Sequence, residues 1–391
     1  MKKSVPTLWN NREDCCGCSA CFAACPQKAI TFQTDDKGFL YPVIDEKECI
    51  GCMSCVKVCS YKKESKDKLE PDRQIILYGA KSKNTDILNE SSSGGMFTIL
   101  SDWILSEKGA VISAVYNIKL HEVGFQLYMD THSRDAARGS KYIQATMGDI
   151  FQTGFNWLKS NPEKKLLFVG TGCQAAGFQA YAMEKKIRNR VIIVDLICHG
   201  APSPGLWKNY AADLEKKCKD KIAKITFKDK KNGWMSPSVY ADIGGQEVSI
   251  EGYSGWFYGG YSIRESCFQC PYTKIERNTD ITIGDYWGVE KKYPDFFDPR
   301  GVSLLIIQSE VGHDVFEQIK DKIDFIEISE KDCLQPRLSS AAKKPDNYDK
   351  FWSDIKIKGF EYCQRKYKEK VSYSLREKIQ RKVKKLFSNS K

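Results

Sequence analysis

Short apolar runs and amphipathic segments alternate along most of the chain. Between residues 75 and 225, strand-like runs (IILYGA, AVISAVY, KLLFVG, VIIVDLI) alternate with segments of helical periodicity (FTILSDWILSEKG, ATMGDIFQTGFNWLK, GFQAYAMEKK). This alternation is typical of an α/β domain, in which helices cover a sheet. From about residue 226 strands, aromatic residues and glycine-rich loops become more frequent, and GVSLLIIQS, HDVFEQIKDK and DFIEIS then predict one further strand, helix and strand.

The first sixty residues have a different pattern, with a short internal repeat. CCGCSACFAACP at 15–26 is echoed by CIGCMSCVKVCS at 49–60, and between them AITFQ and GFLYPVID predict two strands joined by a turn. A charged run at 61–73 is typical of a solvated linker. We therefore expect five parts, which are 1–63 (an α+β domain), 64–74 (linker), 75–225 and 226–340 (two regions of the α/β part) and 341–391 (a basic tail).

The cysteine content of the 391-residue chain indicates which chemistry to expect. The chain has 16 cysteines, no apolar run long enough to span a membrane, and an N-terminus (MKKSVPTLWNNRED) without the apolar core of a secretory signal. In a reducing compartment cysteines bind metals or do redox chemistry rather than form disulfides. The composition therefore predicts a cytoplasmic metal or redox protein.

The net charge of +11 is concentrated at the C-terminus, because residues 364–391 hold 11 Lys and Arg against 2 Asp and Glu. The rest of the chain is nearly neutral, which argues against a nucleic-acid partner. In the tail, apolar residues recur every fourth position beside many lysines, from Val371 to Phe387. Such a basic amphipathic helix predicts peripheral contact with the inner membrane surface. A helix docked on the protein's own body and an acidic partner protein remain alternatives.

Both copies of the N-terminal repeat have the spacing C-x2-C-x2-C-x3-C. In two-cluster ferredoxins the fourth cysteine of such a run binds the other 4Fe–4S cluster. This rule predicts one cluster on Cys15, Cys18, Cys21 and Cys59, and a second on Cys49, Cys52, Cys55 and Cys25. Zinc knuckles also use C-x2-C pairs, but two intact four-cysteine runs in tandem favour the clusters.

Four further cysteines stand at the ends of predicted strands or beside them. Cys173 follows KLLFVG, Cys198 ends VDLIC, and the pair Cys267 and Cys270 precedes DITIGDYWG. Since parallel strands end at one edge of a sheet, these residues form a possible ligand set for a third 4Fe–4S cluster. Zinc binding at this set, and Cys173 and Cys198 as small core residues, are the alternatives.

A candidate anion site lies at SSSGGMFTIL, residues 91–100. Serines can cap the helix there, while Gly94 and Gly95 allow a phosphate to approach free N–H groups at its N-terminus. A plain capped helix explains the same residues. The segment GTGCQAAG, by contrast, has the wrong spacing for a dinucleotide fingerprint.

Six segments occur along the chain in this order: SSSGGMFTIL, RGSKYIQA, FVGTGCQ, DLICHGAPSP, SCFQCPY and DITIGDYWG. On these segments together, the chain resembles the coenzyme F420 hydrogenase/dehydrogenase beta-subunit family over residues 75–310. The resemblance implies an α+β ferredoxin-like N-terminal domain followed by an α/β flavin-binding domain of the F420 hydrogenase beta-subunit type. It also implies bound FAD, a 4Fe–4S cluster at the third cysteine set, and flavin-binding residues at Ser93, Gly94, Gly95, Ser140, Lys141 and Tyr142.

Gly172 inside GTGCQ and the CHGAPSP segment differ from F420-reducing subunits and resemble a bacterial branch that is fused to ferredoxin and often accompanies surface-polysaccharide genes. These differences argue against F420 as the substrate. The expected function is an iron-sulfur flavoprotein oxidoreductase, which takes electrons from ferredoxin or another redox protein and passes them through its clusters and FAD to an unidentified organic acceptor. The alternative is an electron-transfer adaptor without a substrate site of its own.

No catalytic residue is assigned from the sequence. Lys141, Tyr142, His199 and Asp285 are candidates for a general acid, although each also suits cofactor binding or structural support. The remaining cysteines, Cys16, Cys218, Cys333 and Cys363, are expected to be dispensable, and Cys16 stands off register inside a ligand loop where packing explains it.

Overall fold

The computed structural model describes residues 4–61, 75–231 and 233–367, and it confirms a mixed α/β architecture. The predicted linker at 64–74 and the amphipathic stripe from residue 371 onward both lie outside these ranges. Strands from both predicted regions, 75–225 and 226–340, pair in a single large sheet. No helix of the described ranges is long and apolar enough to cross a membrane.

The large sheet has eight strands in the order β13-β3-β12-β11-β7-β6-β4-β5. Their bounds are β3 (Ile76–Ser82), β4 (Ala110–Asn117), β5 (Glu122–Tyr128), β6 (Leu166–Thr171), β7 (Val191–Leu196), β11 (Ile281–Asp285), β12 (Ser303–Ile307) and β13 (Ile323–Glu327). The central strands β4, β6, β7 and β11 run parallel, and the outer pairings are antiparallel. The carboxyl ends of β6, β7 and β11 therefore lie at one edge.

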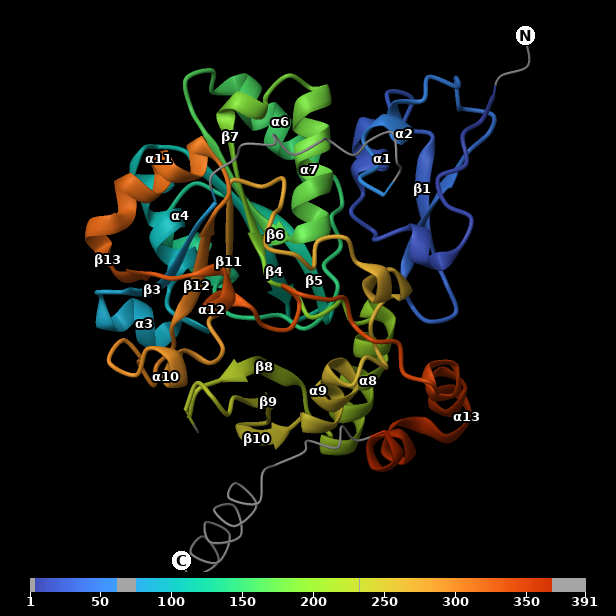
Figure 1. Cartoon of the computed structure of the whole chain (residues 1–391). Coiled ribbons are helices and arrows are strands. Elements are labelled where there is room, and N and C mark those ends of the chain that lie inside the picture. Colours follow the sequence, from blue (N-terminus) through green and yellow to red (C-terminus); the bar gives the residue numbers. More distant parts are fainter. Residues whose placement is uncertain (1–3, 62–74, 232, 368–391) are drawn as a thin grey trace, which may run out of the picture.

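Helices cover both faces of this sheet, with α4 (Met96–Ser106) and α11 (Glu310–Ile319) on one side and α6 (Ile150–Ser160) and α7 (Gly172–Glu184) on the other (Figure 1). Side chains of β6 alternate between them, because Phe168 packs toward α6 and α7 while Leu167 and Val169 pack toward α4 and α11. A strand buried on both faces reads as a continuous apolar run, as LLFV does here.

The N-terminal part contains the antiparallel pair β1 (Ile30–Thr34) and β2 (Leu40–Ile44) and the short helices α1 (Ala20–Ala24) and α2 (Ser54–Lys57). It lies beside α7 in Figure 1. Small residues of α1, such as Ala20 and Ala23, share one apolar cluster with Phe178 and Tyr181 of α7. This contact places the N-terminal cysteines against the helix that begins at the third cysteine set.

A smaller layer lies below the large sheet in Figure 1. It is an antiparallel sheet of β8 (Ile222–Asp229), β9 (Ser238–Ile243) and β10 (Gln246–Ser249), packed with α8 (Pro204–Cys218), α9 (Glu251–Tyr258) and α13 (Tyr348–Lys366). The first half of the range predicted as a tail is thus a packed helix, in which Phe351 and Cys363 are buried and Gly359 (φ +74°) makes a bend.

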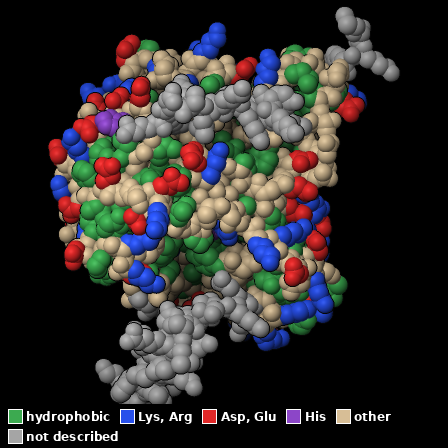
Figure 2. All heavy atoms as spheres, in the orientation of Figure 1, with side chains coloured by type: hydrophobic (Ala, Val, Ile, Leu, Met, Phe, Trp, Pro, Cys, Tyr) green, Lys and Arg blue, Asp and Glu red, His purple; other side chains and the backbone are tan. Residues whose placement is uncertain are grey.

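The remaining helices are short: α3 (Thr85–Glu90), α5 (Thr131–Arg134), α10 (Val289–Lys292) and α12 (Glu330–Cys333). On the face seen in Figure 2, acidic and basic side chains are intermixed, as expected for a body that is nearly neutral once the basic tail is set aside.

Candidate functional site

The third cysteine set surrounds one small cavity at the carboxyl edge of the large sheet. Cys173 lies in the first turn of α7 directly after β6, and Cys198 follows the neighbouring strand β7. Cys267 and Cys270 come from the 3-10 turn η5 (Glu265–Gln269) and its C-cap. All four side chains line the cavity, together with Cys16, Tyr272 and Arg277 among others.

The chemistry of this cavity fits a cluster of the 4Fe–4S type. The N–H groups of Gly200 and Ala201 point at the sulfurs of Cys198 and Cys267, each at 3.4 Å, as hydrogen bonds that tune a cluster do. Burial raises the pKa of Cys198 to about 11 and that of Cys270 to about 12. Metal binding as thiolates would therefore release protons.

Zinc is the alternative metal for these cysteines. Within the ranges that the structure describes, no three His, Cys, Asp or Glu side chains come close enough together to hold a single metal ion.

Each N-terminal set is also brought together in the crossed arrangement that the spacing predicts. Cys25 lines one cavity with Cys49, Cys52 and Cys55, beside Ile30 and Ile44 of the two strands. In the other set, burial and the negative charges of Cys18, Cys15 and Cys59 raise the pKa of Cys21 well above that of a free thiol. The eight predicted ligands of the N-terminal clusters are thus divided between two groups of four.

The internal sequence repeat is also a repeat of backbone geometry. Gly17 and Gly51 both have φ of +72°, and Ser19 and Met53 both have φ of +61°. A left-handed conformation is easy for glycine and costly for most other residues. The two loops therefore wind in the same way.

Cys16 lies between two cysteine sets, which its sequence position did not suggest. It is buried, it lines the cavity of the third set, and hydrogen bonds with Cys173 and Cys18 raise its pKa well above the usual value. The bond with Cys16 in turn lowers the pKa of Cys173 to about 7. The first N-terminal set and the third set are thus separated by little more than one side chain.

A larger cavity of about 290 Å³ opens next to the third set. Its walls come from the start of α4, the segment 137–145, the carboxyl ends of β6, β7 and β11, and β8. Of the residues that the resemblance assigns to flavin binding, those lining this cavity are Ser93, Gly95, Ser140, Lys141 and Tyr142. Cys173, Cys198 and His199 line both this cavity and that of the third cysteine set.

Gly94 lies behind the wall of the large cavity rather than on it. Its N–H group donates to Ser303 Oγ at 2.9 Å, and a Cβ atom there would collide with the Ala80 carbonyl oxygen. The glycine is therefore explained by close packing between the start of α4 and strands β3 and β12.

Lys141 and Tyr142 shape the loop that lines the cavity. Lys141 Nζ donates to the carbonyl oxygens of Ala137, Arg138 and Gly139, all within 3.1 Å, and burial lowers its pKa to about 7. The Tyr142 ring stacks on Phe257 with centroids 4.7 Å apart.

Lys228 is a cavity residue that the sequence analysis missed. It stands on β8 with its side chain 2% exposed, and its ammonium donates to Asp285 Oδ1. Trp234 donates to the same carboxylate oxygen at 2.9 Å and stacks on Trp287. The pattern of apolar and polar residues does not distinguish a lysine that pairs with a carboxylate far away in the chain, so this pair is visible only in the tertiary structure.

His199, a candidate general acid, lines the same cavity. Burial lowers its pKa to about 4, so it is neutral at pH 7.

Comparisons with known proteins identify two matched regions of the chain. Residues 14–63 match the 4Fe-4S dicluster domain, and residues 163–332 match the family that describes the C-terminal part of the beta subunit of coenzyme F420 hydrogenase/dehydrogenase. A structure of the F420-reducing [NiFe] hydrogenase complex from Methanosarcina barkeri aligns with 76% of this chain and 94% of its own at 16% identity, with a TM-score of 0.45. No curated protein matches. The chain thus combines a 4Fe-4S dicluster domain in its N-terminal part with a region that is similar to the beta subunit of coenzyme F420 hydrogenase/dehydrogenase.

Proposed function

We propose that the protein is an iron-sulfur flavoprotein oxidoreductase. It takes single electrons at the N-terminal clusters, passes them to a third cluster on Cys173, Cys198, Cys267 and Cys270, and delivers them to FAD in the neighbouring cavity and on to an organic acceptor. The observation that carries this proposal is the wall that the two cavities share, to which Cys173, Cys198 and His199 contribute. A cluster and a flavin on either side of that wall would lie close enough for direct electron transfer.

The burial of the cysteine sets supports an order for the relay. In the set of Cys25, Cys49, Cys52 and Cys55, Cys52 is exposed, and Ile50 and Met53 beside it are 48% and 39% exposed. The other N-terminal set packs against α7 through Cys18. The exposed set is therefore the entry point for a redox partner, and the inner set hands electrons to the third cluster.

The chain supplies the surroundings for the flavin in this proposal. Backbone N–H groups at the start of α4 and the hydroxyl groups of Ser93 and Ser140 would bind it, and Lys141 would hold the neighbouring loop in place. Bound FAD converts single-electron input into two-electron chemistry. Lys228, which lines the same cavity and donates to Asp285, can supply a proton to an acceptor, since burial lowers its pKa.

Anaerobic reconstitution of the full chain tests the proposal. We expect about twelve iron atoms, counting four for each of three cubanes, stoichiometric FAD, and bleaching of the flavin spectrum when reduced ferredoxin is added. A screen of quinones, enones and other conjugated carbonyl compounds would then identify the class of acceptor. Full iron loading without FAD and without reduction of any acceptor would instead support the adaptor function.

A further inference from the structure

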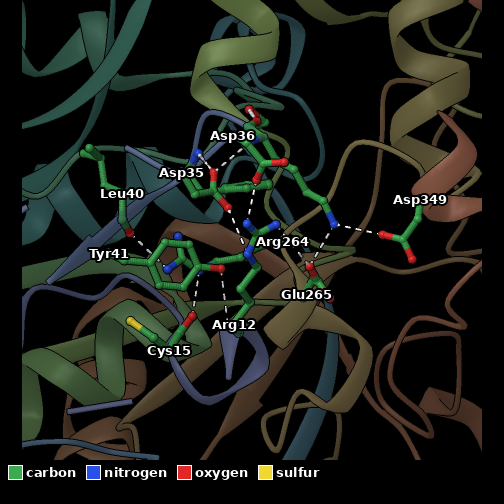
Figure 3. Close-up of polar contacts among 12 residues, drawn as sticks. Arg12, Cys15, Asp35, Asp36, Leu40, Tyr41, Arg264, Glu265 and Asp349 are labelled. Carbon is green, nitrogen blue, oxygen red and sulfur yellow. Dashed lines mark hydrogen bonds and ion pairs between the residues drawn. The ribbon is translucent and has the colours of Figure 1, made fainter. Parts of the chain in front are cut away.

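Arg264 lies where the N-terminal part meets the rest of the molecule, and it is 1% exposed. Its guanidinium donates from Nε to the Cys15 carbonyl oxygen at 2.6 Å and from Nη2 to the Leu40 carbonyl oxygen at 3.0 Å. Figure 3 shows it beside the ring of Tyr41, whose centroid is 4.0 Å away. One arginine of the C-terminal region thus binds the backbone of the N-terminal part at two places.

Arg264 also organises the third cysteine set through its own backbone. Its carbonyl oxygen accepts from the Cys267 N–H group at 2.9 Å, and its N–H group donates to the Ala201 carbonyl oxygen at 3.0 Å. Ala201 in turn directs its N–H group at the Cys267 sulfur at 3.4 Å. The side chain of Arg264 therefore contacts one ligand loop while its main chain is part of another.

Gln144 completes this link. Its Oε1 accepts from Arg264 Nη1 at 3.2 Å, and its Nε2 donates to the Cys16 carbonyl oxygen at 2.9 Å. The loop of Cys15 and Cys16 fits closely against both side chains, because a Cβ atom on Gly17 would come within 2.8 Å of Gln144 Nε2 and 3.1 Å of Arg264 Nη1.

The guanidinium has no carboxylate partner among the described residues. The neighbouring Glu265 pairs instead with Lys37 at 2.9 Å, with Lys344 at 3.2 Å and more distantly with Arg12, as Figure 3 shows in part. A buried charge without a counter-charge is strongly unfavourable, and a tyrosine ring supplies only a modest attraction. The balancing negative charge must therefore come from the groups that the adjoining loops hold.

Those loops carry the predicted ligands of two clusters. A cubane bound by four thiolates has a net negative charge, which increases when the cluster takes up an electron. A fixed positive charge nearby stabilises the reduced form more than the oxidised form, and burial strengthens the effect because the local dielectric constant is low.

We propose that Arg264 is the shared counter-charge of the cluster on Cys15, Cys18, Cys21 and Cys59 and the cluster on Cys173, Cys198, Cys267 and Cys270, and that it raises the reduction potentials of both. The inference rests on the third cluster of the proposed function. Because one charge acts on both clusters, it raises the two potentials in the same direction and does not drive them apart, so it adds no uphill step to electron transfer between the N-terminal part and the large domain.

The test is a redox titration of the reconstituted full-length protein, followed by electron paramagnetic resonance. In Arg264→Met, we expect the reduced-to-oxidised ratio of the inner N-terminal cluster and the third cluster to fall at least tenfold at a fixed potential, which corresponds to a drop of about 59 mV. The outer cluster on Cys25, Cys49, Cys52 and Cys55 should keep its potential. Arg12→Met is the matched control, because Arg12 is 35% exposed and pairs with Asp36, and it should leave all three potentials in place.

Two further variants keep the inference testable if Arg264→Met fails to load iron. Gln144→Glu leaves the arginine but places a carboxylate against Nη1, and it should lower the same two potentials. Arg264→Lys keeps the charge and should preserve them. Unchanged potentials in Gln144→Glu, or an equal drop in Arg264→Lys and Arg264→Met, would overturn the inference. Failure of the proposed function would show in a different measurement, the iron content of the wild-type protein. A content of about eight iron atoms would mean that there is no third cluster with which Arg264 could interact.

Discussion

Gly177 of helix α7 lies directly against Cys18, because a Cβ atom added at position 177 would come within 2.8 Å of the Cys18 sulfur. The same helix begins at Gly172 and carries Cys173 in its first turn. A single rigid element thus contacts a predicted ligand of the inner N-terminal cluster and supplies one to the third cluster. The distance between these two sites is set by the helix rather than by a loop.

This contact predicts an unusual result for Gly177→Ala. In an exposed helix interior, alanine would stabilise the protein by about 1 kcal/mol relative to glycine. Here the added methyl group collides with a buried sulfur, and overpacking of this kind costs about 1–3 kcal/mol. We expect a net loss of stability and a partial loss of iron from the inner N-terminal cluster, measured by urea unfolding and by iron analysis.

The neighbouring exchange Ala176→Gly provides the control for this prediction. It should cost about 1 kcal/mol through helix propensity alone and leave the iron content unchanged. A Gly177→Ala protein that is more stable than wild type and keeps all its iron would mean that the contact with Cys18 yields without cost.

The iron content separates the third cysteine set from the other two. Replacing Cys267 and Cys270 by serine should reduce the iron from about twelve to about eight atoms per chain, because only one of three cubanes loses ligands. Cys218→Ser is the control, since Cys218 is exposed at the end of α8 and should not change the value. Equal iron in the double variant and in wild type would show that these cysteines hold no cluster.

Much of the fold follows from local patterns in the chain. The central strands were predictable because each is a short apolar run buried on both faces, as in LLFV of β6 and VIIV of β7. Strand β5 was missed, since its sequence EVGFQLY is broken by Gly124 and its pairing with β4 is a tertiary feature. Helix α8 was also missed, although Ser203 as N-cap and Pro204 in its first turn are standard start signals.

Some residues of the candidate site could likewise be predicted from the sequence, and others could not. Cysteine spacing is a local property, so the grouping of the N-terminal sets could be inferred from sequence, and strand ends indicated where Cys173 and Cys198 would meet. By contrast, Arg264, Gln144 and Lys228 act through partners far away in the chain, such as Cys15 and Asp285. A single sequence contains no signal for contacts of that range.

The flavin site can be tested with a pair of variants at Ser92, whose Oγ accepts from the Ser140 N–H group at 3.0 Å on the cavity wall. Ser92→Asp keeps an acceptor there but adds a negative charge where a dinucleotide phosphate would bind. We expect FAD content to fall severalfold with full retention of iron, while the neutral Ser92→Asn retains FAD. Absorbance and released-flavin fluorescence measure the difference, and equal FAD in both variants would place the phosphates elsewhere.

Gly95 is a less suitable position for that test. Its φ is +89°, and an added Cβ atom would meet Ile87 at 3.0 Å and Ser82 at 3.2 Å. A larger residue would therefore disturb the start of α4 itself, and a loss of flavin could not be distinguished from a local change in fold.

The pair of Lys228 and Asp285 should matter for stability as well as for the cavity. Asp285→Asn leaves the buried ammonium of Lys228 without its counter-charge, and we expect a loss of about 3–5 kcal/mol in the free energy of unfolding. Glu247→Gln breaks the pair of Lys231 and Glu247, in which both side chains are 55% exposed, and should cost less than about 1 kcal/mol. Urea titrations of the two variants provide the comparison, and similar losses would show that burial does not strengthen the inner pair.

The pH dependence of FAD binding depends on Lys141. Burial lowers the pKa of this lysine to about 7, so the ammonium form gives way to the neutral amine as the pH rises above that value. An anionic dinucleotide in the adjacent cavity favours the charged form and raises the pKa again. Binding therefore takes up a proton above pH 7, and by linkage the affinity for FAD should fall as the pH rises, by up to about tenfold per pH unit.

Fluorescence titrations of the FAD-free protein between about pH 6 and pH 9 measure this dependence. The pyrophosphate of FAD keeps its charge over the whole range, so the slope reports on the protein. Lys141→Met should bind FAD more weakly at pH 6 and show a flat profile, because it has no proton to take up. An equal slope in wild type and in Lys141→Met would assign the proton to another group and remove Lys141 from the flavin site.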